Sequence, residues 1–104
     1  MATLYITEYA ALQSTSYVGG SSFTAQTPKE PAVATQIVAI SGSSTQSSPF
    51  NPLTRFVRLH PDNICSYAFG PNPTAVTTAN RMIAGQTEYF GVNNGDSVAV
   101  ILNV

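Results

Sequence analysis

The side chains best suited to catalysis in this sequence are His60 and Cys65, the only histidine and the only cysteine among 104 residues. They flank the turn Pro61-Asp62-Asn63, which would bring them near one another. A cysteine–histidine nucleophile needs the two groups about 3 Å apart and a third group that orients the base. Strand alternation, however, puts Cys65 beside Tyr67 and Phe69 on a core-facing side, where burial raises the pKa of a thiol and makes it unreactive. We therefore predict that this pair is not catalytic.

Other kinds of reactive site also lack their residues. A zinc site needs three or four Cys, His or carboxylate ligands. The acidic residues are dispersed along the chain, with no cluster suited to calcium: Glu8, Glu30, Asp62, Glu88 and Asp96. Gly19-Gly20 lacks the lysine and the following helix of a phosphate-binding loop. The sequence predicts a protein that is not an enzyme and has no metal or cofactor.

Charge is unusually sparse. Only 9% of the residues are charged, against about 25% in a typical soluble domain. Four lysines and arginines are too few to neutralise several phosphates, so we expect no nucleic-acid binding. A net charge of −1 gives little repulsion between copies, which is compatible with life in an assembly. An ordinary polar β-protein surface explains the same composition.

The sequence also bears on compartment. No run approaches the roughly 20 apolar residues of a membrane span, so no membrane partner is expected. Residues 1–8 lack the basic and apolar regions of a signal peptide. A single cysteine allows no internal disulfide, which fits synthesis in a reducing cytoplasm.

Short β-type runs, separated by Gly, Pro, Asn and Ser, dominate the chain. No amphipathic helix is predicted, and 10–13 form at most one helical turn. The pattern predicts one all-β domain over 1–104, a β-sandwich or jelly-roll-like small barrel of about seven or eight short strands. The expected strands are 3–8, 35–41, 54–60, 63–69, 81–84, 87–92 and 97–104.

The end of the chain is predicted to be a hairpin. Asn93-Asn94-Gly95-Asp96 separates the last two strands, and Asn-Gly accepts the positive φ angles of a tight turn. In the last strand Val98 and Val100 share one face, while Ala99 and Ile101 share the other. Both faces are therefore apolar, which predicts a central strand.

Two long polar loops are expected, over 13–34 and 41–52. Loops of this length are often functional. Tyr17 and Phe23 lie in the first and Phe50 in the second. Each ring can anchor its loop to the chain's own core or insert into a pocket of a neighbouring subunit.

Arg55 is a further candidate contact residue. In strand alternation it shares a face with Val57 and Leu59, which suggests burial at the end of a sheet or in a subunit contact. A charge that guards an edge strand against aggregation is the alternative. The candidate interface residues are thus Tyr17, Phe23, Phe50 and Arg55.

Three segments carry a resemblance to a known group of proteins. They are Thr54–His60 (TRFVRLH), Ile64–Pro73 (ICSYAFGPNP), and Gln86–Val92 (QTEYFGV) with the later SVAVI. The set resembles small proteins encoded near the head genes of tailed phages and prophages. The resemblance implies a virion location and a capsid decoration (cement) subunit with a jelly-roll-like fold. Its implied partners are the major capsid protein or another virion protein and further copies of itself, a trimer being favoured over a dimer.

Two other functions remain open. One is a head–tail, tail or baseplate component, which a low copy number per virion would indicate. The other is a carbohydrate-binding β-sandwich that stacks sugars on Tyr5, Tyr9, Tyr17 or Tyr89.

Overall fold

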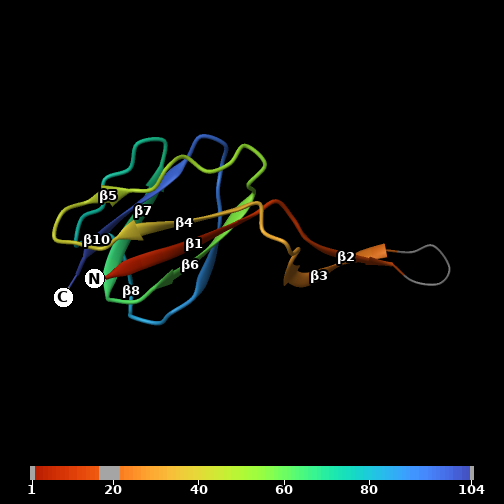
Figure 1. Cartoon of the computed structure of the whole chain (residues 1–104), viewed down its shortest axis with the longest axis horizontal. Helices are drawn as coiled ribbons and strands as arrows, with labels where there is room; N and C mark the ends of the chain where they lie inside the picture. The colour runs from red at the N-terminus through yellow and green to blue at the C-terminus, as the bar shows by residue number, and fades with distance from the viewer. Residues whose placement is uncertain (1, 17–21, 104) are drawn as a thin grey trace.

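A computed structural model describes residues 2–16 and 22–103, and within these ranges the ordered elements are all strands (Figure 1). Each of the seven predicted strands overlaps an observed one, which confirms the all-β prediction. The strands are β1 (Thr3–Tyr9), β2 (Leu12–Ser16), β3 (Ser22–Pro28), β4 (Ala34–Ala39), β5 (Thr45–Gln46), β6 (Phe56–Pro61), β7 (Cys65–Gly70), β8 (Asn80–Met82), β9 (Glu88–Gly91) and β10 (Ser97–Leu102).

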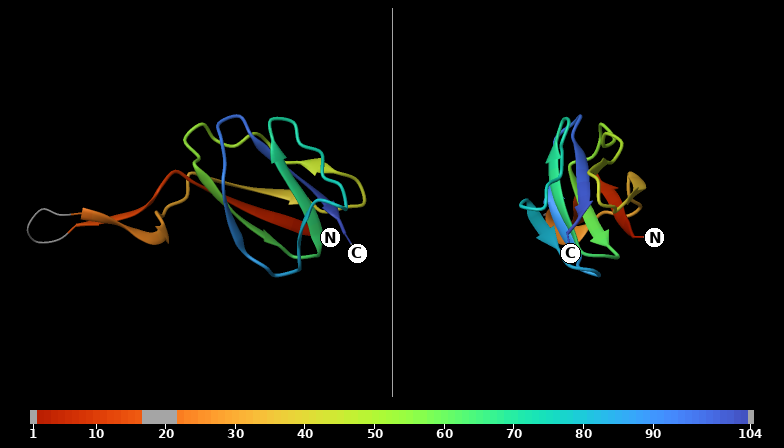
Figure 2. Two further views of the ribbon diagram at one scale, coloured as in Figure 1. Left: turned by 180° about the vertical axis from the view of Figure 1, so that it is seen from behind. Right: turned by 90° about the vertical axis from the view of Figure 1, so that its left-hand side faces the viewer.

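Eight of the strands form a two-layered body, which Figure 2 shows from two further sides. Sheet 1 has the order β4-β1-β6-β9 and sheet 2 the order β5-β10-β7-β8. Every pairing is antiparallel. The remaining two strands, β2 and β3, pair only with each other.

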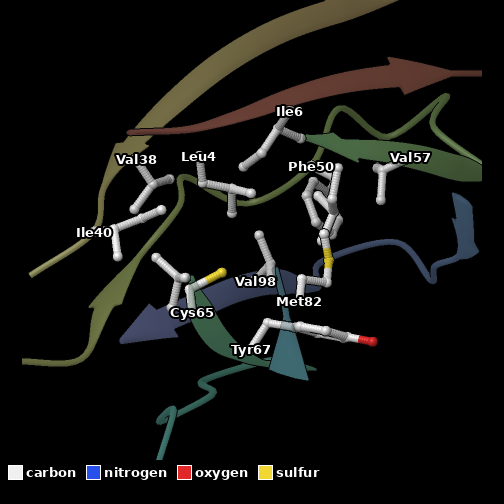
Figure 3. Close-up of a cluster of buried hydrophobic side chains, with 12 residues drawn as sticks. Leu4, Ile6, Val38, Ile40, Phe50, Val57, Cys65, Tyr67, Met82 and Val98 are labelled. Carbon is white, nitrogen blue, oxygen red and sulfur yellow. The ribbon is translucent and has the colours of Figure 1, made fainter. Parts of the chain in front are cut away.

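The core lies between the two sheets because alternate residues of their strands are apolar and face inward. In sheet 1 these are Leu4 and Ile6 of β1 and Val57 and Leu59 of β6, all essentially inaccessible to solvent. Sheet 2 contributes Cys65, Tyr67, Met82, Val98 and Val100. Figure 3 shows side chains from both sheets meeting in this layer.

The strand order is that of a jelly roll with its last strand placed first. In an eight-stranded jelly roll, the last strand lies between the first and the third, and the sixth flanks the third. In the other sheet the seventh lies between the second and the fourth, and the fifth flanks the fourth. If the body strands are numbered from β4, so that β10 is the seventh and β1 the eighth, sheet 1 has the order 1-8-3-6 and sheet 2 the order 2-7-4-5. These are the two sheets of a jelly roll.

The predicted position of the last strand is confirmed. β10 lies inside sheet 2, between β5 and β7, and Val98, Ala99 and Val100 are all fully buried. Val98 and Val100 belong to the core between the sheets. On the outer side, residues 71–79 lie over the sheet: Asn103 Nδ2 donates to both Ser66 Oγ and Thr77 O, at 2.7 and 3.0 Å.

The predicted final hairpin is wrong. The turn forms, with Asp96 N donating to Asn93 O at 3.1 Å and Gly95 at φ +86°. However, β9 pairs with β6 in sheet 1, whereas β10 pairs with β5 and β7 in sheet 2. The turn therefore carries the chain across the sandwich. The reason is burial: Phe90 of β9 packs against the rings of Tyr67 and Phe69 in the facing sheet, each 5.1 Å away.

The predicted loop over 13–34 is also wrong in part, because β2 and β3 form a hairpin there. Leu12 lies opposite Pro28 and Ser16 opposite Ser22, with a register shift between 12 and 14. This hairpin, here called the arm, projects from one end of the body (Figure 1), and the molecule measures 55 × 26 × 22 Å. The second predicted loop, 41–52, is irregular apart from the two residues of β5.

Candidate interaction surfaces

Cys65 and His60 do not form a catalytic pair. Cys65 is fully buried in the core, and burial raises the pKa of its thiol to about 11. His60 is half-buried and alternates with the buried Leu59, so its ring lies on the outer face of sheet 1. There its Nδ1 is 2.7 Å from Thr87 Oγ1. The two side chains thus lie on opposite sides of a sheet, as the alternation of their strands predicts.

Neither a cluster of metal ligands nor a membrane-spanning helix occurs among the described residues. Within 2–16 and 22–103, no three His, Cys, Asp or Glu side chains gather in a way that could hold a metal ion. The same part of the chain contains no helix of the length and apolarity needed to span a membrane.

The foot of the arm is fixed to the body through Tyr9. Its ring stacks on Phe56 of β6, with centroids 5.3 Å apart and planes at 21°. Its hydroxyl donates to Glu30 Oε2 at 2.9 Å, just beyond the end of β3. Burial, followed by this contact with the Glu30 carboxylate, raises the pKa of Tyr9. A main-chain bond from Lys29 N to Ala11 O, 3.0 Å long, closes the foot.

A pocket of about 380 Å³ lies at this foot, between the arm and the β6–β9 side of sheet 1. Most of its lining is apolar, and it is open to solvent. Tyr89 is 52% exposed and forms part of its wall. The lining residues are Leu12, Gln26, Pro28, Phe56, Tyr89, Phe90 and Gly91.

The arm carries no charged residue. From Tyr9 to Pro28 the sequence has no Asp, Glu, Lys or Arg, and the two charged residues that follow, Lys29 and Glu30, belong to the foot. The arm is therefore an uncharged stretch of the chain. Contact with such a surface removes few ions from water, which keeps the desolvation cost of binding low.

A buried carboxylate fastens the 41–52 loop to sheet 1. Glu8 Oε1 accepts from Asn51 N at 2.7 Å and from Thr54 Oγ1 at 2.8 Å, while Oε2 accepts from Gln36 Nε2 at 3.1 Å. This role of Glu8 is not among those predicted from the sequence. The signal available in the sequence was its position, since Glu8 is an even-numbered residue of β1 and shares the inward face with Leu4 and Ile6.

Of the four predicted interface residues, only Arg55 presents a described, exposed side chain. It precedes β6 and is not buried at a sheet end. Phe50 is 3% exposed and packs 6.4 Å from Phe69, so its assignment to an interface is wrong: its ring fills the chain's own core. Phe23 lies in β3, opposite Thr15, and Tyr17 lies outside the described residues.

Of the four tyrosines considered as surfaces for stacking sugars, one is buried, two are exposed and one is not described. Tyr9 is buried under the arm, which excludes it as an exposed platform. Tyr5 and Tyr89 are exposed on the outer face of sheet 1, and Tyr5 lies opposite Ile37 of β4. Tyr17 again lies outside the described residues.

Comparison with known proteins identifies no relative: no family model, no curated protein and no solved structure matches this chain.

Proposed function

We propose that this protein is a structural subunit of a virus particle, a capsid decoration subunit that holds a neighbouring virion protein through its arm. The observation that carries the proposal is the arm itself. A hairpin without charge, seated on a jelly-roll body, extends away from the core that stabilises its own chain. The resemblance of the strand segments to phage head-region proteins gives the partner class.

The energetics of such a role agree with the composition. A specific protein–protein interface buries about 1,600 Å² in total, and a narrow arm contributes only part of that area. Repetition over a capsid lattice compensates, because many weak contacts act together. Sparse charge serves this arrangement, since neighbouring copies repel one another little.

Binding to capsids tests the proposal. The purified protein is added to capsids assembled from the major capsid protein of the same genome, without any decoration subunit. We expect ordered extra density on the shell by electron cryomicroscopy and a higher capsid disruption temperature. Absence of both would refute a decoration role.

An arm-less variant tests the part played by the arm. Lys29 N donates to Ala11 O at 3.0 Å, so residues 12–28 can be replaced by Asn-Gly, a favoured two-residue hairpin turn closed by that same hydrogen bond. We expect this variant to unfold cooperatively like the full chain and to lose capsid binding. A matched control, Thr78→Lys, adds a charge to an exposed site of the body and should bind normally. If the folded arm-less variant binds as well as the full chain, the arm is not the contact.

Carbohydrate binding is the second candidate function, and the pocket at the foot of the arm favours it. Phe56 and the exposed Tyr89 offer aromatic surface there, and Gln26 offers a polar group. A glycan array should then give signals that Tyr89→Ala abolishes and Tyr5→Ala, an exposed tyrosine away from the pocket lining, retains. A blank array for the unmodified protein would remove this candidate.

A further inference from the structure

The outer edge of β4 has unpaired main-chain groups. Ile40 N donates to Ala2 O at 3.0 Å, and the β1–β4 register therefore makes the even-numbered residues of β4 the ones bonded to β1. In an antiparallel strand, the intervening residues direct N–H and C=O the other way. These are Thr35, Ile37 and Ala39. In the described part of the chain, no other segment bonds to their main-chain groups.

The other three outer strands of the body are protected in ways that β4 is not. Edge strands are commonly made unsuitable for pairing by a charge or by being very short. β9 carries Glu88, β8 carries Arg81, and β5 has only two residues. β4 has six residues, ATQIVA, without charge or proline, and no charged residue occurs from Pro31 to Thr54.

Exposed apolar side chains accompany this edge. Ile37 is 69% exposed on the outer face of sheet 1, and Thr35 and Ala39 are exposed beside it. Tyr5, directly opposite Ile37 in the register, extends the apolar row toward the middle of the sheet. A partner strand on β4 would cover Ile37 and satisfy the free main-chain groups at once.

We propose that β4 pairs with β4 of a second copy of this chain, antiparallel across a two-fold axis at Ile37. Thr35 and Ala39 lie at equal distances along the strand from Ile37. The axis therefore sets Ile37 against the second copy's Ile37, and Thr35 against its Ala39, each pair exchanging both main-chain hydrogen bonds. The two copies of sheet 1 then join into one continuous sheet. A strand without charge is suited to meeting its own copy, because like charges placed opposite one another would oppose the pairing.

The position of the arm is compatible with this dimer. The arm leaves the body at the end of β1 and the start of β4, and it extends along the direction of those strands (Figure 1). A two-fold axis through Ile37 places the second arm at the opposite end, so the arms do not meet. The pairing predicts a dimer, where the resemblance implied a trimer, and it does not depend on capsid binding.

Solution mass tests the pairing. Light scattering and sedimentation equilibrium over a concentration series should show a reversible monomer–dimer equilibrium for the unmodified protein. Ile37→Lys sets two like charges at the axis and removes apolar contact, so it should weaken the dimer at least about tenfold. The control is Ile83→Lys, because Ile83 is 60% exposed but follows β8 in the other sheet; it should leave the dimer unchanged.

A cross-link fixes the register. In a hydrogen-bonded antiparallel pair the Cα atoms are about 5.5 Å apart, within the range of about 4.4–6.8 Å that a disulfide spans. Mild oxidation of Ile37→Cys should give a covalent dimer, whereas Ile83→Cys should not, and the buried Cys65 stays unreactive. A monomer at every concentration would overturn the proposal. So would a dimer that Ile37→Lys leaves intact, or one in which Ile37→Cys fails to cross-link.

Discussion

The body and the arm are both built from antiparallel strand pairs, yet they are held in place differently. In the body, the longer strands bury apolar side chains against the opposite sheet. The pairing of β1 with β6 is thus stabilised by the burial of side chains such as Leu4 and Leu59, which are inaccessible to solvent. In the arm, β2 and β3 pair only with each other, and a lone hairpin is marginally stable in water. What orders the arm is its foot, through Tyr9, Phe56 and Glu30.

This difference indicates a division of roles. The apolar core that stabilises the fold lies in the body, whereas the arm is an uncharged hairpin outside that core. Substitutions should therefore have effects that fall off from the core through the foot to the arm.

The largest loss of stability is expected in the core. Leu59→Ala removes a fully buried side chain of β6 and should lower the free energy of unfolding by about 2–5 kcal/mol. Urea denaturation followed by circular dichroism measures it. The control Leu53→Ala truncates a leucine that is exposed and should cost less than about 0.5 kcal/mol. Similar losses for the two variants would contradict the assignment of the core.

The next largest effect is expected at Glu8. Glu8→Ala leaves the Asn51 amide and the Thr54 hydroxyl without their acceptor, and should cost about 3 kcal/mol. Glu8→Gln keeps one acceptor oxygen and should cost about half as much. Hydrogen exchange of the Asn51 amide should quicken in the same order. Equal stability of the alanine variant and the unmodified protein would show that this carboxylate does not fasten the loop.

At the foot of the arm a smaller effect is expected. Tyr9→Phe keeps the ring on Phe56 but removes the hydroxyl that donates a hydrogen bond to Glu30. It should lower the free energy of unfolding by about 1 kcal/mol. Exchange of the Lys29 amide should become faster, because its bond to Ala11 closes the foot. Exchange of the Asp62 amide, bonded to Thr3 within the body, should not change. Faster exchange at both sites would mean that foot and body are not separate.

The smallest effect is expected in the arm. Gln26→Lys places a charge on an exposed residue of β3 and should change the free energy of unfolding by less than about 0.5 kcal/mol. The same urea denaturation applies. A loss above about 1 kcal/mol would show that the arm packs on the body more closely than its foot alone.

Sequence patterns predicted the body well because its strands alternate. Burial of Leu4, Ile6 and Val57, and the central place of β10, follow from period-two spacing. The pattern did not give the partners of β9. Asn-Gly chemistry fixes the turn near Gly95, but which strand pairs with which depends on burial of Phe90 against the facing sheet. The arm was missed because its residues show no apolar–polar alternation in the sequence, and alternation is the signal from which the other strands were predicted.

The candidate surfaces were harder to predict. An isolated ring in a polar loop, such as Phe50, can face its own core or a partner, and only the path of the loop decides. The unprotected edge of β4 depends on strand order, which local pattern does not contain. Glu8 was the exception, since its inward parity on β1 was readable from the sequence.

Because the strand order of the jelly roll is permuted, the start of the first strand and the end of the last strand lie close to each other and far from the arm. Ala2 bonds to Ile40, and Leu102 bonds to the adjacent Ser41, at the end of the body opposite the arm (Figure 1). A second protein fused at either end would be carried on that far side. Such a fusion would leave the arm, the contact proposed above, unobstructed at the other end of the molecule.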